Sequence, residues 1–245
     1  MNPTVPTIQP LDLGGVNSYL LRTENGFILV DTGGHLVLDK VFDNRREKLL
    51  QALASAGCVK GTLRLILLTH GDVDHAGNAA FLSRTLDAPI AMHPGDLELV
   101  SAPTLDLFMA SYHYQSFMLR TVFRMMRKKI LLVTQKTLDD FEPFQPDILL
   151  EDGMSLKSYG LDGTILHLPG HTDGSVGLLL ADGSLLVGDL LANNKKPAPA
   201  PNANDFTELA KSIKKLSLYP IENVYPGHGR PFSLKEFAGT SSNAS

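Results

Sequence analysis

Four side chains that can bind a metal or carry a proton lie within six positions of the stretch THGDVDH, residues 69–75. They are His70, Asp72, Asp74 and His75. The apolar run before them predicts a buried strand over 63–69. If the stretch is extended, the side chains at 70, 72 and 74 share one side, and His75 follows as the chain turns toward a helix. This pattern favours a metal site, although a solvated loop would use the same residue types as caps and turn formers.

Three later segments each place a His or an Asp beside glycine, directly after a predicted apolar strand. They read LPGHTDGS with His171, LLVGDL with Asp189 and YPGHG with His228. Glycine permits tight turns and lets the backbone approach a bound group closely. Together with the first stretch they supply enough ligand-type side chains for two metal ions. Because the single Cys58 cannot form a thiolate cluster, His and carboxylates must hold any metal, and these suit harder or borderline ions.

The composition is that of a globular protein with a sizeable core. Of the 245 residues, 43% are hydrophobic and 20% are charged, which excludes disorder throughout. The net charge of −4 gives no global field that would draw the chain to nucleic acid or to an acidic membrane. No apolar run is long enough for stable membrane insertion, and no signal peptide is recognisable at the N-terminus. We therefore expect a cytoplasmic protein that acts on a small molecule.

The elements that must position these residues alternate between strands and helices. A hairpin is predicted over 18–23 and 26–32, and further strands over 63–69, 89–93, 162–170, 175–183, 184–190 and 221–229. Helices are predicted over 43–57, 78–86 and 205–218, the last with Asp205 as its N-cap, after a Pro-rich loop at 192–205. The strand, helix, strand order is typical of α/β folds.

A helical insertion is predicted over about 101–147, a segment that is rich in Met and Phe and apolar on more than one face. Within it, residues 117–131 combine five Arg and Lys side chains with a broad apolar face. Three roles compete. The apolar face could be core or a homodimer interface, it could line a pocket for an acyl group, or it could contact an anionic membrane surface. The side chains considered for the pocket are Phe117, Phe123, Met125 and Met126.

The order of the motifs resembles that of the metallo-β-lactamase superfamily. HxDxDH is followed by PGHT, GD and PGHG, with NSYLL and VDTG near the N-terminus. The resemblance covers nearly the whole chain. It implies a single domain over residues 1–245 with an α/β fold, a four-layer αββα sandwich whose metal site lies at one edge of the two sheets. In such folds a lid often covers the metal cleft, and the helical insertion is the segment long enough to form one.

The same resemblance implies how two divalent ions would be shared. His70, Asp72 and His171 would hold one ion, Asp74, His75 and His228 the second, and Asp189 would bridge them. The Asp equivalent to Asp31 lies close behind the ligands, where it would hydrogen-bond a metal-bound imidazole, although a turn-forming role is equally well supported. The remaining histidines are not assigned to a metal, and for His35 we expect a surface position; they are His35, His93, His113 and His167.

Asp72 departs from the superfamily's usual HxHxDH motif, which has a second His at that place. A related branch, the flavin-linked di-iron oxygen reductases, carries Glu there. Two divalent ions facing three carboxylates leave one positive charge, whereas the usual pattern leaves two, so the bound water should be less acidic. An added oxygen ligand also favours harder ions, and iron or manganese therefore competes with zinc.

These observations predict metal-assisted hydrolysis, in which a water or hydroxide held between two ions attacks the substrate and Asp74 orients it or accepts its proton. A less positive cluster holds a dianionic phosphate weakly, which favours the carbonyl of an ester, thioester or lactone. Phosphodiesterase and β-lactamase activities are the alternatives. From another class, a di-iron redox or oxygen-handling protein would need a separate electron-transfer partner.

Overall fold

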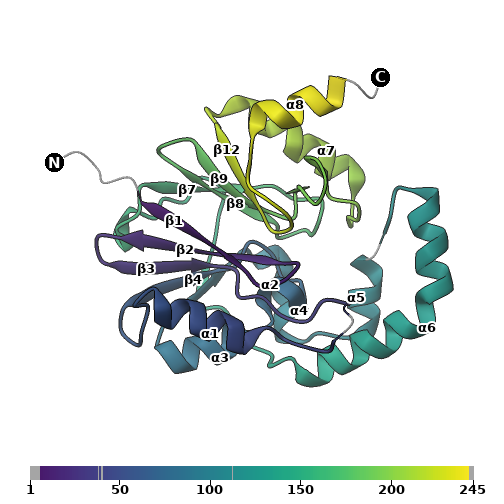
Figure 1. Cartoon of the computed structure of the whole chain (residues 1–245), viewed down its shortest axis with the longest axis horizontal. Helices are drawn as coiled ribbons and strands as arrows, with labels where there is room; N and C mark the ends of the chain where they lie inside the picture. The colour runs from purple at the N-terminus through teal and green to yellow at the C-terminus, as the bar shows by residue number, and fades with distance from the viewer. Residues whose placement is uncertain (1–5, 38, 40, 112, 243–245) are drawn as a thin grey trace.

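Two β-sheets packed face to face form the middle of the computed structural model, which describes residues 6–37, 39, 41–111 and 113–242 (Figure 1). The first sheet has the strand order β1 (Thr7–Asp12), β2 (Asn17–Thr23), β3 (Gly26–Val30), β4 (Leu63–Leu67), β5 (Ile90–Met92), β6 (Ile148–Leu149). The second has the order β13 (Phe232–Ser233), β12 (Asn223–Pro226), β9 (Ser184–Gly188), β8 (Val176–Leu180), β7 (Gly163–His167). A small separate ladder pairs β10 (Leu191–Ala192) with β11 (Ala198–Pro199).

Helices cover the outer face of each sheet (Figure 1). The first sheet is covered by α1 (Arg46–Ser55) and α3 (Ala79–Leu86), and the second by α7 (Phe206–Lys215) and α8 (Leu234–Ser242). Short helices lie at α2 (Val73–Ala76) and α4 (Leu97–Ser101), with 3-10 turns at Pro94–Asp96, Lys157–Tyr159 and Leu216–Leu218. The layers are therefore helix, sheet, sheet and helix, which confirms the predicted αββα sandwich.

Buried side chains alternate between the faces of each strand, and this alternation builds the layers. In β3, Ile28 and Val30 pack in the cluster between the two sheets, whereas Phe27 and Leu29 pack against the helices of the first sheet. A third cluster lies between the second sheet and its helices, with Leu185 and Val187 pointing into it. The central strands of each sheet are buried on both faces, and they therefore read as continuous apolar runs.

The local signals of the sequence correspond to the observed turns and caps. Thr23 pairs with Gly26, so Glu24 and Asn25 form the predicted hairpin turn. The carboxylate of Asp205 accepts hydrogen bonds from the backbone N–H groups of Thr207 and Glu208, as expected of an N-cap. Cys58 packs in the core, and burial raises the pKa of its thiol to about 11.

Short or exposed elements escape prediction from the sequence. Strand β1 contains Pro10 and leaves most of its side chains exposed, so it carries no apolar run, and β6 and β13 have only two residues each. The predicted loop over 192–205 is irregular except where β11 pairs with β10. Helix α8 continues to Ser242 along a polar stretch that gives little helical signal.

The segment predicted as an insertion is helical. It contains α5 (Leu105–Ser111) and the 24-residue α6 (Phe117–Asp140), which arches around one side of the molecule (Figure 1). The buried side chains of α6 are Ile130, Thr134 and Thr137, and the first half of the helix is largely exposed. Among the described residues, no helix is both long and apolar enough to cross a membrane.

Candidate metal centre

The candidate ligands all follow the carboxyl ends of strands at one edge of the sandwich. The 70–75 stretch follows β4, His171 follows β7, Asp189 follows β9, and His228 follows β12. In the first sheet β4 runs parallel to β3, and in the second β12 runs parallel to β9, so within each sheet the carboxyl ends of these strands lie at the same edge. The structure thus brings together all seven side chains that the sequence singled out.

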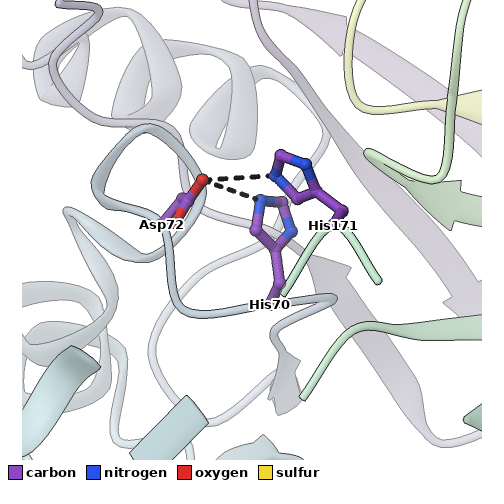
Figure 2. A group of neighbouring side chains, drawn as sticks. All are labelled: His70, Asp72 and His171. Atoms are coloured by element: carbon purple, nitrogen blue, oxygen red, sulfur yellow. Dashed lines mark hydrogen bonds and ion pairs between the residues drawn. The ribbon is translucent and has the colours of Figure 1, made fainter. Parts of the chain in front are cut away.

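Three of these side chains form a first group (Figure 2). His171 Nε2 lies 3.2 Å from Asp72 Oδ2, and His70 Nε2 lies 3.8 Å from the same oxygen. The rings of His70 and His171 are nearly perpendicular, at 84°, with centroids 4.9 Å apart. Two imidazole nitrogens and one carboxylate oxygen therefore face a common point, which is the donor set of a mononuclear metal site.

A second group is built from Asp74, His75 and His228. Asp74 Oδ2 lies 3.3 Å from His228 Nε2 and 3.8 Å from His75 Nε2. Asp189 stands between the two groups. Its Oδ1 lies 3.3 Å from His75 Nε2, and its Oδ2 lies 3.1 Å from His228 Nε2 and 3.8 Å from His171 Nε2. This is the position that a bridging carboxylate would need.

Several buried polar atoms in these groups have no hydrogen-bond partner. They are His70 Nε2, His75 Nε2, Asp72 Oδ1 and Asp189 Oδ1. A buried polar atom without a partner costs about 1–3 kcal/mol, so proteins rarely keep several in one place. All four belong to the donor groups that face one another, and metal ions bound there would satisfy them. The residues present therefore fit two divalent cations.

Each of the four imidazoles is held from behind through its Nδ1 atom. Nδ1 of His171 lies 3.1 Å from the carbonyl oxygen of Asn202, and Nδ1 of His228 lies 2.6 Å from that of Gly15. A carbonyl only accepts, so in both rings Nδ1–H donates and the Nε2 lone pair points into the site. This fixes the tautomer that a metal ligand requires.

Asp31 holds the other two imidazoles. Its Oδ2 accepts from His75 Nδ1–H at 2.9 Å and from the Thr69 hydroxyl at 2.8 Å, and its Oδ1 accepts from the Thr69 backbone N–H at 2.8 Å. The Thr69 oxygen in turn lies 2.9 Å from His70 Nδ1. Asp31 is buried and adopts a left-handed backbone with φ of 59°, which Asp tolerates better than most residues. The predicted position behind the ligands is where the structure places it.

The carboxylates of the site raise the pKa of three of its four imidazoles when no other cation balances them, whereas burial and the neighbouring imidazoles lower the pKa of His70. Burial alone lowers the pKa of His75 and of His228, but Asp189 and Asp74 outweigh it and raise both well above the usual value. For His171, burial is outweighed by the hydrogen bond to Asp72 and by the charge of Asp189, and the pKa rises to about 9. The cluster therefore requires positive charge, and metal ions would displace the protons.

Comparisons with known proteins identify the family of the chain. The family model described as the metallo-β-lactamase superfamily matches residues 11–228. The chain belongs to the metallo-β-lactamase superfamily.

Several proteins are similar to this superfamily member over most of its length. A probable metallo-hydrolase, YqjP of Bacillus subtilis strain 168, is 25% identical and covers 94% of this chain and 71% of its own. The crystal structure of TTHA1623 in a di-iron-bound form is 29% identical, covers 97% of each chain and gives a TM-score of 0.62. A metallo-β-lactamase family protein from Thermus thermophilus, TTHA1429, has a TM-score of 0.68 at 24% identity, over 98% of this chain and 77% of its own.

The NSYLL motif of the superfamily has a structural role that the sequence alone did not give. Asn17 donates through Nδ2 to the carbonyl oxygens of Pro226 and Gly229, at 3.0 and 2.7 Å, and Tyr19 donates its hydroxyl to Pro226 at 2.6 Å. These bonds tie the loop that carries His228 to the start of β2. Within that loop a Cβ on Gly227 would collide with the Asp189 carboxylate, so the glycine allows the close approach expected from the sequence.

Asp96 is a positioning residue that the sequence analysis missed. It is buried, and its carboxylate accepts from the backbone N–H groups of Gly71 and Gly174, at 2.8 and 2.6 Å, and from the Thr172 hydroxyl at 2.7 Å. It thereby joins the loop of His70 and Asp72 to the loop of His171. Burial raises the pKa of Asp96 to about 6 against these three hydrogen bonds. In the sequence it is only an Asp after the HPG turn, with no motif around it.

The other histidines lie outside the two ligand groups. The expected surface position of His35 is wrong, because this side chain is buried, lines the cleft beside the metal groups, and places Nε2 2.8 Å from Asp140 Oδ2 of α6. His93 and His167 stack on each other with ring centroids 3.9 Å apart. The carbonyl oxygen of His113 accepts from the Ala203 backbone N–H.

Side chains of the two candidate ligand groups line a cleft of about 450 Å³. Of the side chains expected to line a substrate pocket, Phe123 and Met126 line a neighbouring apolar hollow. The expectation does not hold for Phe117 and Met125, because they lie on the outer side of α6 and are 77% and 81% exposed.

Replacing Asp31 by Asn should lower metal affinity about 10- to 100-fold, since an amide cannot accept all three hydrogen bonds that orient His70 and His75. A chelator competition with zinc or iron measures this directly. Asp87→Asn is the matched control, because Asp87 also has a left-handed backbone, with φ of 58°, but is exposed and remote from the candidate ligands. Equal affinities for the two variants would contradict the role of Asp31.

Proposed function

We propose that this superfamily member is a dinuclear-metal-dependent hydrolase that acts on the carbonyl of an ester, thioester or lactone. The observation that carries the proposal is the convergence of four imidazoles and three carboxylates whose buried donor atoms lack partners. Membership of a superfamily of metallo-hydrolases supports hydrolysis in general. When bound, two divalent ions would polarise the substrate oxygen, activate a water and stabilise developing negative charge.

The residues of the chain have distinct tasks in this proposal. His70, Asp72 and His171 would hold one ion, Asp74, His75 and His228 would hold the other, and Asp189 lies where it could contribute to both. Asp74 also lines the cleft, so its carboxylate would face the carbonyl of a substrate bound there. Ionised, it can accept a hydrogen bond from a water in the cleft and orient that water, or take its proton as the carbonyl is attacked.

The charge of the cleft supports a carbonyl substrate. Among the described residues that line it there is no Lys or Arg, and the one acidic side chain outside the candidate ligands, Asp39, is paired with Arg45. Enzymes that hold a dianionic phosphate commonly use Arg or Lys at the phosphate. A neutral or monoanionic acyl group costs less to bring into such a cleft, and this favours ester, thioester and lactone substrates over phosphate esters.

A substrate panel tests the proposed function. Purified protein reconstituted with zinc, manganese or iron is assayed on an acyl ester, an acyl thioester, a lactone, a phosphodiester and a β-lactam. We expect the highest kcat/KM on one of the first three, and a loss of roughly a hundred- to ten-thousandfold in Asp74→Asn at matched metal content. A preference for the phosphodiester or β-lactam would contradict the proposal. Oxygen consumption with an added electron donor, without hydrolysis, would favour the di-iron redox alternative.

We further propose that Asp72 favours iron or manganese over zinc in this centre. The hard carboxylate oxygen replaces the imidazole that the superfamily motif usually has, and one similar protein, TTHA1623, has been crystallised in a di-iron-bound form. The extra anionic ligand also makes the cluster one charge less positive.

Metal analysis of protein from a medium with balanced zinc, iron and manganese tests the role of Asp72. We expect the wild type to retain iron or manganese, and Asp72→His, which restores the usual motif, to shift the content toward zinc. Two zinc ions per wild-type chain, or identical metal contents in the two proteins, would contradict the proposal. The comparison does not depend on knowing the substrate.

A further inference from the structure

An apolar hollow of about 270 Å³ lies beside the metal cleft, under the first half of α6. Side chains on one face of that helix line the hollow. Most of them are three or four residues apart, as neighbours on one helix face are. These side chains are Leu119, Val122, Phe123, Met126 and Ile130. Tyr114 and Pro201 close the hollow on the opposite side. Its lining contains no charged side chain among the described residues.

Apart from the buried Ile130, the lining side chains of α6 are not part of the hydrophobic core. None of them belongs to the three buried clusters that hold the layers together. Leu119, Phe123 and Met126 remain only half-buried, and of these side chains Ile130 alone is fully buried. Apolar surface left open beside a polar cleft is characteristic of a ligand site, because covering it with an apolar group is favourable.

The hollow adjoins the metal cleft. Tyr114 and Pro201 line both spaces. Tyr114 also pairs with Asn202 in a β-bridge, and the carbonyl of Asn202 holds Nδ1 of His171. The ring of Tyr114 lies 5.5 Å from that of Phe123, so a single side chain links the wall of the hollow to the segment that positions a candidate ligand.

We propose that this hollow binds the alkyl chain of the substrate, so that the hydrolysed carbonyl lies at the metal centre and its acyl chain extends under α6. The inference rests on the proposed function and adds a substrate class, medium- to long-chain acyl compounds. Phe123 and the adaptable Met126 would line the chain's path. The two walls that the hollow shares with the cleft, Tyr114 and Pro201, favour the substrate itself as the occupant over a second copy of the protein.

The outer side of α6 is a separate surface. Phe117, Met118 and Met125 are exposed there, beside Arg120 and Arg124. A dimer interface or membrane contact would use this outer side, whereas the hollow faces the cleft. The adjacent residues Met125 and Met126 therefore provide a matched pair for substitution, because Met125 is exposed on the outer side of α6 and Met126 lines the hollow.

A series of acyl thioesters from acetyl to dodecanoyl tests the proposal. We expect kcat/KM to rise about three- to fourfold per added methylene until the hollow is full. Met126→Gln should lower kcat/KM for the dodecanoyl thioester roughly tenfold and leave the acetyl thioester unchanged. Met125→Gln should change neither. Val122→Phe, a second variant at a half-exposed position, should narrow the hollow and remove the preference for long chains.

Calorimetric binding of decanoate to the metal-loaded protein separates this inference from the proposed function. Binding that Met126→Gln weakens and Met125→Gln does not, without hydrolysis of any ester, thioester or lactone, would refute the proposed function and support the alkyl site. Hydrolysis that is independent of chain length, with decanoate binding unaffected by Met126→Gln, would overturn the alkyl site. A loss of dimerisation in Met126→Gln with unchanged decanoate binding would also overturn it, in favour of an interface between copies.

Discussion

Mutual repulsion among the carboxylates of Asp72, Asp74 and Asp189 is the constraint on which the rest of the molecule depends. The three groups are held together, only partly exposed, at one edge of the two sheets, where water screens their charges less than it does at an open surface. Such an arrangement is stable only if cations lie among them. The four imidazoles offer neutral nitrogen lone pairs to the same space, and two divalent ions would satisfy both requirements.

The fold supplies this arrangement through contacts behind the ligands. Asp31 orients His75 directly and His70 through Thr69, Asp96 links two ligand loops, and Asn17 anchors the loop of His228. These residues come from different parts of the chain and meet because both sheets end at the same edge. Metal affinity and folding are therefore coupled, since the ligand positions exist only in the assembled sandwich.

The structure could be predicted best from the sequence where a local pattern specifies a single element. Long apolar runs predicted the central strands, and an Asp before a helix predicted a cap, because these signals are local. The seven candidate ligands were recognised because four short motifs occur in a fixed order. By contrast, the role of Asp96 and the burial of His35 depend on which loops meet in space, and β6 and β13 are too short to carry a pattern. The partition of α6 into an inner and an outer apolar side follows from packing that no periodicity specifies.

If two metal ions occupy the two donor groups with Asp189 between them, anomalous diffraction from crystals of the metal-loaded protein will locate both. We expect two anomalous peaks, one bounded by His70, Asp72 and His171 and the other by Asp74, His75 and His228, with Asp189 in contact with both. A single peak, or a second ion held without His228 and Asp74, would contradict it.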